Sequence, residues 1–168
     1  MKNKYLSLLI FSNFLIFLDQ ATKYMVASHI PLHFSIRIVD GFFNLTHIRN
    51  PGVAFGLFAR STLEHKVYFF IIISSIAIGA ILVFFHQTPS SKKPVLFGLI
   101  LIFSGAIGNL IDRVIYKEVI DFLDFYYKNY HWPAFNIADS CITIGVGYMI
   151  YDLFNPEGQQ SSISPSKN

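Results

Sequence analysis

Residues 67–85, with the sequence VYFFIIISSIAIGAILVFF, form an apolar stretch of nineteen residues without a charge. A second stretch, VLFGLILIFSGAIGNLI at 95–111, adds seventeen more after a short loop that contains Lys92 and Lys93. As a helix, each stretch is about long enough to cross ~30 Å of hydrocarbon. The two stretches therefore predict membrane-spanning helices, and they decide the fold class.

Two further apolar stretches predict two more spans. Residues 5–18 are apolar and are followed by Asp19, after which a helical pattern continues. Residues 135–154 are apolar except near their two ends. The sequence thus predicts an all-α integral membrane protein with a single membrane-embedded domain at 1–155. Its four transmembrane helices are expected at about 5–27, 67–86, 94–113 and 136–154.

Composition agrees with a membrane protein and disfavours several other classes. The chain of 168 residues is 53% hydrophobic and only 14% charged, whereas soluble domains have about a quarter of their residues charged. The formal charge of +3 is spread along the chain, so we expect no nucleic-acid partner. Cys141 is the single cysteine, and the six histidines lack the spacing of metal ligands. We therefore expect no metal and no cofactor.

Basic residues orient the spans. Lys2 and Lys4 precede the first span, and Lys92 and Lys93 lie between the second and the third, so the positive-inside rule places both termini in the cytoplasm. A basic start before an apolar run is also typical of a cleavable signal peptide. No small-residue cleavage site follows the run, so a retained anchor is favoured.

With this orientation, six of the ten acidic residues gather at the level of the outer leaflet. They are Asp19, Asp112, Glu118, Asp121, Asp124 and Asp139. Ionisable groups at membrane depth are costly and usually functional. Two carboxyl groups in a poorly hydrated pocket cannot both ionise cheaply, so Asp121 and Asp139 at one level match the proton-sharing pair of an aspartic hydrolase.

The outer segments differ from the spans. Residues 34–60 alternate apolar and polar side chains between turns at Asp40-Gly41 and Asn50-Pro51-Gly52, which predicts a small β-hairpin or sheet. The apolar run at 121–127 predicts a short interfacial helix lying against the membrane. Residues 156–168 lack apolar periodicity and are expected to form a disordered inner tail.

Each polar motif also has a purely structural explanation. Asp19 and Lys23 are four residues apart, the spacing of an ion pair that neutralises a helix end. The motif GNLIDR at 108–113 contains an arginine that could snorkel beside its counter-ion. The motif FNIADS at 135–140 fits a helix N-cap followed by an acid in the first turn.

Taken together, five motifs resemble those of the signal peptidase II family in order and in interval. They are FLDQATK, RNPGVAFG, GNLIDR, VIDF and FNIADS, and they extend over about residues 15–140. Members of that family are aspartyl proteases of the bacterial inner membrane. They cut the signal peptide from prolipoproteins immediately before a cysteine that carries diacylglycerol. The resemblance implies four transmembrane helices, an outer β-cradle and a short outer helix.

The resemblance also implies the site. The catalytic pair would be Asp121 and Asp139, with the active site at the outer leaflet. Residues that support the site or bind the substrate would be Asp19, Lys23, Asn50, Gly52, Asn109, Asp112, Arg113, Asn136 and Ala138. Of these, Asn50 and Arg113 would contact the substrate or the antibiotic globomycin. Partners would then be a prolipoprotein with a diacylglyceryl-cysteine, membrane lipid and globomycin-type inhibitors.

A small proton-coupled membrane transporter is the competing hypothesis, because buried acids in a four-span bundle are expected there too. Transporters usually show internal repeats with broken helices at the midplane. Here the acids cluster at one leaflet and the two halves of the chain do not resemble each other. Which aspartate of the pair holds the shared proton stays open, because a coupled pair titrates as a unit.

Overall fold

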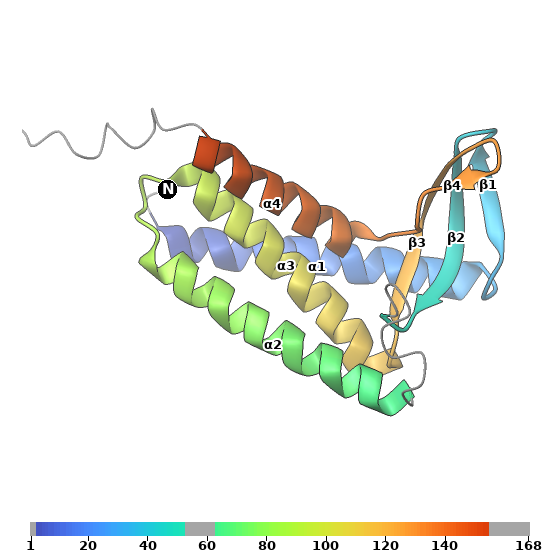
Figure 1. Cartoon of the computed structure of the whole chain (residues 1–168), viewed down its shortest axis with the longest axis horizontal. Helices are drawn as coiled ribbons and strands as arrows, with labels where there is room; N and C mark the ends of the chain where they lie inside the picture. Colours follow the sequence, from blue (N-terminus) through green and yellow to red (C-terminus); the bar gives the residue numbers. More distant parts are fainter. Residues whose placement is uncertain (1–2, 53–62, 155–168) are drawn as a thin grey trace, which may run out of the picture.

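A computed structural model of the chain describes residues 3–52 and 63–154, which form four long helices and a small sheet (Figure 1). The helices are α1 (Lys4–His29), α2 (Leu63–Gln87), α3 (Lys93–Tyr116) and α4 (Ile137–Phe154). All four are long and apolar enough to cross a membrane. This confirms the prediction of four membrane-spanning helices.

Local sequence signals set the helix boundaries. Oδ1 of Asn3 accepts a hydrogen bond of 3.1 Å from the backbone N–H of Leu6, so Asn3 caps the start of α1. Pro94 lies in the first turn of α3, where its missing N–H costs nothing. At the other end of α3, Lys117 adopts the left-handed conformation that often terminates helices.

The outer surface of the bundle is apolar. Phe17 of α1 is 70% exposed and Leu153 of α4 is 71% exposed. Many other large apolar side chains of the four helices are also exposed. A soluble monomer rarely exposes such continuous apolar surface. Hydrocarbon solvates it without cost, so the chain is a multi-pass membrane protein.

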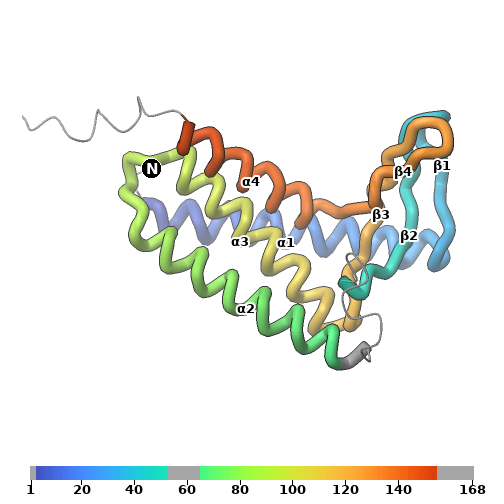
Figure 2. The backbone as a smooth tube through the Cα atoms, viewed as in Figure 1, coloured from blue at the N-terminus to red at the C-terminus, as the bar shows by residue number. Residues whose placement is uncertain are grey.

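Helix α3 lies at the centre of the bundle and packs against α1, α2 and α4 (Figure 2). Its contact with α4 depends on two glycines that face each other. A Cβ atom on Gly98 would lie 2.8 Å from the carbonyl oxygen of Gly145, and one on Gly145 would lie 2.6 Å from that of Gly98. Small residues at this crossing therefore allow the two backbones to approach closely.

A four-stranded antiparallel sheet lies beyond one end of the bundle, opposite the N-terminus and the α2–α3 loop (Figure 1). Its strands, in spatial order, are β1 (Ser35–Val39), β2 (Phe43–Asn50), β3 (Val119–Tyr127) and β4 (Tyr130–His131). Strands β1 and β2 form the predicted hairpin. Residues 53–60 of the predicted outer β segment, and the predicted tail 156–168, lie outside the described residues.

The prediction of an interfacial helix at 121–127 is wrong, because these residues belong to β3. Residues Val119, Ile120 and Phe122 are buried, and β3 pairs with β2 along most of its length. Val, Ile, Phe and Tyr are typical strand residues, and pairing satisfies their backbone groups. The helix prediction considered only the apolar character of the run. Within residues 3–52 and 63–154 the structure contains no short interfacial helix.

The sheet is attached to the C-terminal end of α1. Val26 of α1 and Ile30, the residue that caps the end of α1, pack against Phe122 of β3 in a buried apolar cluster. Nδ1 of His47 on β2 lies 2.8 Å from the carbonyl oxygen of Ile30, which adds a hydrogen bond to this attachment. The attachment fixes β3 relative to the helices, and β3 carries Asp121.

Candidate active site

Asp121 and Asp139 come from different elements that meet where the sheet joins the bundle. Asp121 lies on β3 directly opposite Ile48 of β2, and Asp139 lies in the first turn of α4. Asp121 is 2% exposed. The pair is therefore held by a strand on one side and a helix N-terminus on the other.

Asn136 is the N-cap of α4. Its Oδ1 accepts a hydrogen bond of 2.8 Å from the backbone N–H of Asp139, and its own N–H donates to Oδ2 of Asp139 at 3.3 Å. This reciprocal arrangement is a capping box. The structural explanation of FNIADS is thus correct, and it does not exclude a functional one, because Nδ2 of Asn136 also donates to Oδ1 of Asp121 at 2.8 Å.

Asn50 holds the second oxygen of Asp121. Its Nδ2 donates to Oδ2 of Asp121 at 2.9 Å, while its Oδ1 accepts from the backbone N–H of Gly52 at 2.9 Å. Gly52 has a φ of +81°, and a Cβ atom there would lie 2.5 Å from the ring of Phe70. Glycine is therefore needed at this turn, which fixes the direction of the Asn50 amide.

Burial raises the pKa of Asp121 to about 6. The hydrogen bond from Asn50 opposes this rise, and the negative charge of Asp139 adds to it. The hydrogen bond from Asn136 and the positive charge of Lys23 act in the opposing direction. A carboxyl group with this pKa exchanges its proton near neutral pH, which acid and base catalysis requires.

Lys23 is the centre of a buried charge cluster. Its Nζ lies 2.8 Å from Oδ2 of Asp19 and 2.9 Å from Oδ2 of Asp112, and it donates to Oδ1 of Asn109 at 3.1 Å. An ammonium has three hydrogens and no acceptor, so these three contacts use it completely. The Asn109 amide must then turn its Nδ2 away from Lys23, and this atom donates to Oδ1 of Asp139 at 2.7 Å.

The two carboxylates of this cluster hold the residues next to the candidate pair. Oδ2 of Asp112 accepts from the backbone N–H of Ile120 at 3.1 Å, one residue before Asp121. Oδ1 of Asp19 accepts from the backbone N–H of Ala138 at 2.9 Å, one residue before Asp139. The ion pair predicted for Asp19 and Lys23 is present, and it forms part of a network that positions both elements.

Gln20 belongs to this network, and sequence reasoning missed it. Its Nε2 lies 2.9 Å from Oδ1 of Asp112, 3.2 Å from Oδ2 of Asp19 and 3.1 Å from the carbonyl oxygen of Gly108. Gln20 stands inside the FLDQATK motif, and an amide within a membrane span needs partners. The presence of this amide in a predicted span is therefore the sequence feature that could have identified Gln20.

Arg113 lies at the edge of the site. Its Nη1 donates to the backbone carbonyl of Asn109 at 3.3 Å, and its guanidinium lies 5.4 Å from the centroid of the Phe70 ring. The negative charges of Asp139 and Asp121 attract the positive guanidinium. Hydrogen bonds and ion pairs thus link all eleven predicted site residues. Asp124 lies outside this network and instead binds Asn44 and His131.

Comparison with known proteins identifies the family. The family model described as Signal peptidase (SPase) II matches residues 11–155. The chain belongs to the signal peptidase II family. This membership makes it a peptidase with several membrane-spanning helices, and it does not support the competing hypothesis of a transporter.

Relatives within the signal peptidase II family align with most of the chain. A lipoprotein signal peptidase of Desulforapulum autotrophicum is 52% identical over 145 residues, which cover 86% of this chain and 90% of that protein. A lipoprotein signal peptidase of Syntrophus aciditrophicus is 45% identical over 161 residues, or 96% of this chain and all of that protein.

Solved structures of two bacterial membrane enzymes, both determined by the in meso method, share the fold. The first, at 2.3 Å resolution, has a TM-score of 0.79 and 33% identity, covering 96% of this chain and 94% of that one. The second, at 1.9 Å resolution, has a TM-score of 0.79 and 36% identity, covering 89% of this chain and 93% of that one.

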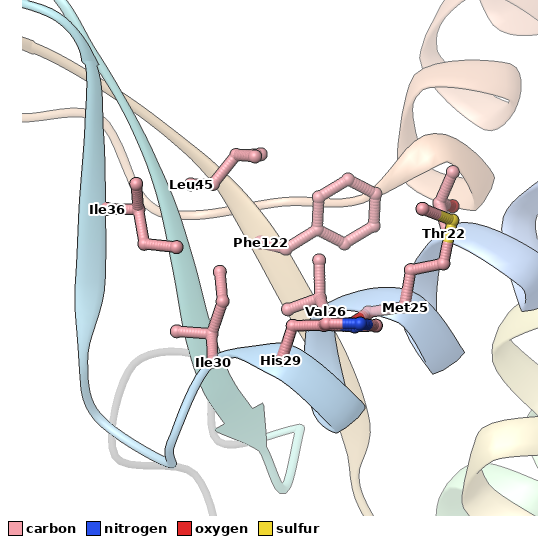
Figure 3. Close-up of a pocket in the computed structure, with 8 residues that line it drawn as sticks. All are labelled: Thr22, Met25, Val26, His29, Ile30, Ile36, Leu45 and Phe122. Atoms are coloured by element: carbon pink, nitrogen blue, oxygen red, sulfur yellow. The ribbon is translucent and has the colours of Figure 1, made fainter.

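A separate apolar pocket of about 310 Å³ opens between the C-terminal end of α1 and the sheet (Figure 3). Side chains of α1, β1, β2 and β3 line it, among them Met25, Ile36 and Leu45. No carboxylate lines this pocket among the described residues. It lies apart from the two carboxyl groups of the candidate pair, neither of which lines it.

Proposed function

We propose that the chain is an aspartic endopeptidase that removes the signal peptide from prolipoproteins, cutting before a diacylglyceryl-modified cysteine. Membership of the signal peptidase II family supports the reaction and the substrate class. The observation that carries the aspartic mechanism is the link between the two carboxyl groups through Asn136. The raised pKa of the buried Asp121 supports the same mechanism.

In this mechanism the pair carries one proton and one negative charge. The ionised carboxylate accepts a proton from a water molecule, whose oxygen attacks the carbonyl carbon of the scissile peptide. The protonated carboxyl donates its proton to the carbonyl oxygen, which gives a neutral tetrahedral diol. When the C–N bond breaks, the amine leaves with the proton that the first carboxylate had taken. A hydroxyl of the diol returns its proton to the second carboxylate, which leaves a carboxylic acid and restores the pair. No covalent intermediate is formed.

The surrounding residues then have separate tasks. Asn109 and Asn136 donate to Asp139 and Asp121 and thereby hold the two carboxyl groups in fixed directions. Lys23 orients the Asn109 amide. Asn50 and Arg113 lie at the edge of the pair and are proposed to donate hydrogen bonds to the peptide backbone of the substrate.

We also propose that the chain lies in the bacterial inner membrane with both termini in the cytoplasm. Lys4 and Lys92 are at the end of the bundle opposite the sheet (Figure 1), in agreement with the positive-inside rule. Asp121 and Asp139 would then lie at the outer leaflet. The diacylglyceryl chains are already out of water in a membrane, so their main effect would be to fix the depth of the cysteine.

A defined assay tests this proposal. Purified protein in detergent micelles is mixed with a peptide that contains a diacylglyceryl-cysteine after a signal sequence, and products are identified by mass spectrometry. We expect one cut before the lipidated cysteine, insensitivity to chelators, inhibition by globomycin and much slower cleavage of the unlipidated peptide. Absence of this cut by folded protein, or its loss on chelation, would overturn the proposal.

A further inference from the structure

A second pocket, of about 470 Å³, lies among the outer strands. We call it the distal pocket. Its lining includes Ser35, Thr46, Ile48, Asp124, His131 and Trp132. None of these residues belongs to the candidate active site, and nothing in the proposed mechanism uses them.

The distal pocket adjoins the active site at Ile48 of β2. Ile48 pairs directly with Asp121, and side chains opposite each other on neighbouring strands share a face. Along β2, Asn50 and Ile48 share that face. The β2–β3 register shifts between Ile48 and Leu45, so Thr46 is placed beside Ile48 by the pocket that both line and not by strand alternation. Asn50 binds Asp121, while Ile48 and Thr46 line the pocket.

The apolar pocket of Figure 3 lies on the opposite face. Leu45 lines it and the next residue, Thr46, lines the distal pocket, and Ile36 and Ser35 divide in the same way. Consecutive side chains of a strand point to opposite faces. Ile48, which pairs with Asp121, lines the distal pocket and not the apolar one, so the distal pocket is the one that adjoins the active site.

The hydroxyl groups of Ser35 and Thr46 and the carboxyl group of Asp124 in the distal pocket are already hydrogen-bonded within the protein. The Ser35 hydroxyl donates to Oγ1 of Thr46 at 3.0 Å, and the Thr46 hydroxyl lies 3.3 Å from a backbone carbonyl that accepts from it. Asn44 and His131 each donate to one oxygen of Asp124, at 2.9 Å and 2.8 Å. Lone pairs remain on the two hydroxyl oxygens and on the carboxylate. These three groups thus present acceptor positions, which suit a ligand that donates hydrogen bonds.

Charge and aromatic surface point to the same kind of ligand. Asp124 is of low exposure, and among the described residues that line the pocket the basic ones are His33 and His131, with no lysine or arginine. The indole of Trp132, 70% exposed, offers a face over which a cation can lie. A lysine or arginine side chain supplies the donors and the positive charge together.

We propose that the distal pocket binds a basic side chain of the mature chain, a few residues after the scissile bond. This inference rests on the proposed function. The signal peptide would lie along the apolar helices, whereas the sheet lies beyond their ends (Figure 1), where the mature chain leaves the membrane. An extended peptide advances about 3.3 Å per residue, so about two to four residues after the cysteine reach from Asp121 to Asp124.

The first experiment needs no variant. Three lipidated peptides differ only in carrying Lys, Gln or Glu at the third position after the cysteine, and kcat/KM is measured for each with the wild-type protein. Matched sets place the same three residues at the second and fourth positions. At one of these positions, we expect Lys to be cleaved about tenfold faster than Glu, with Gln between them.

Two variants then assign the preference to the pocket. Asp124→Asn removes the charge, and Trp132→Ala removes the aromatic face of an exposed side chain, so that each should reduce the Lys-to-Glu ratio. Asp40→Asn is the matched control, because it makes the same charge change at a side chain that is 83% exposed on the same sheet. Its ratio should remain that of the wild type.

The possible failures are distinguishable. If no lipidated peptide is cleaved at all, the proposed function falls and the pocket assignment falls with it. If all peptides are cleaved at equal rates at every position, the function stands and the distal pocket is not a binding site for the mature chain. A preference for Lys that survives unchanged in both Asp124→Asn and Trp132→Ala would also overturn the assignment.

Discussion

The side-chain amide of Asn136 donates a hydrogen bond of 2.8 Å to Oδ1 of Asp121, which ties the N-cap of α4 to strand β3. The same side chain accepts the backbone N–H of Asp139 through its oxygen. One residue therefore fixes the relative position of the two carboxyl groups. Asn50 donates to the other oxygen of Asp121, and Asn109 donates to Asp139. Neither carboxyl group can therefore turn without breaking a hydrogen bond.

Replacing either member of the pair should abolish cleavage. In Asp121→Asn and Asp139→Asn we expect losses larger than the roughly 10²–10⁴-fold typical of one acid or base, because the pair acts as a unit. Cleavage of the lipidated peptide measures the effect, with Asp40→Asn as the control that keeps activity. If either variant retained a tenth of wild-type turnover while correctly folded, the assignment of the pair would have to be abandoned.

Removing the buried ammonium should destabilise the protein. Lys23→Met leaves Asp19 and Asp112 without a counter-ion, and breaking a buried ion pair costs about 3–5 kcal/mol. Lys92→Met removes a partly exposed lysine 3.6 Å from Asp152 and should cost at most about 1 kcal/mol. Thermal unfolding in detergent compares them. Equal melting temperatures for the two variants would show that the Lys23 cluster does not stabilise the fold.

The close approach at Gly108 should tolerate no side chain. In Gly108→Ala the new Cβ would lie 2.6 Å from Oδ2 of Asp19, so either this oxygen must leave Lys23 or the helices must separate, at a cost of about 1–3 kcal/mol. Gly79→Ala on α2 adds a Cβ with nothing within 4 Å and should be neutral or stabilising by about 1 kcal/mol. Yield, melting temperature and cleavage rate are the measurements. Wild-type values in Gly108→Ala would contradict the packing described for this site.

The pH profile should report the proton shared by the pair. Because burial raises the pKa of Asp121 to about 6, kcat/KM should fall as the pH rises above that value and the pair loses its proton. The Asn50 hydrogen bond favours the ionised carboxylate, so Asn50→Ala should raise this pKa and move the basic limb to higher pH. Asn13→Ala, distant on α1, is the control. A basic limb that stays in place or moves to lower pH would refute this electrostatic account.

Substrate and inhibitor should be recognised by the same groups. Arg113→Ala should reduce cleavage of the lipidated peptide and weaken globomycin inhibition together, because a guanidinium at the edge of the site would donate to both backbones. Arg37→Ala, an exposed arginine on β1, should change neither. Inhibition constants and kcat/KM are measured side by side. Reduced cleavage with unchanged inhibition would separate the two roles and contradict a shared binding group.

The sequence alone determined the four spans, because about twenty uncharged residues such as 67–85 have no alternative to a helix in hydrocarbon. It also identified the candidate residues, since Asp19, Lys23, Asn109 and Asp112 are polar groups that a membrane span does not keep without a reason. The alternation at 34–60 similarly predicted the β1–β2 hairpin. Each of these inferences depends on neighbours within a few residues in the sequence.

Only the tertiary structure decided how these residues are arranged. The run at 121–127 became a strand because its hydrogen-bonding partner, β2, lies some seventy residues earlier in the chain, and no local pattern reports such a partner. The direction of the Asn109 amide is decided by Lys23 on another helix, and the distal pocket exists only because β1, β2 and β3 align. Apolar periodicity is a local property of the chain, whereas hydrogen bonds between distant segments depend on where the whole fold places them.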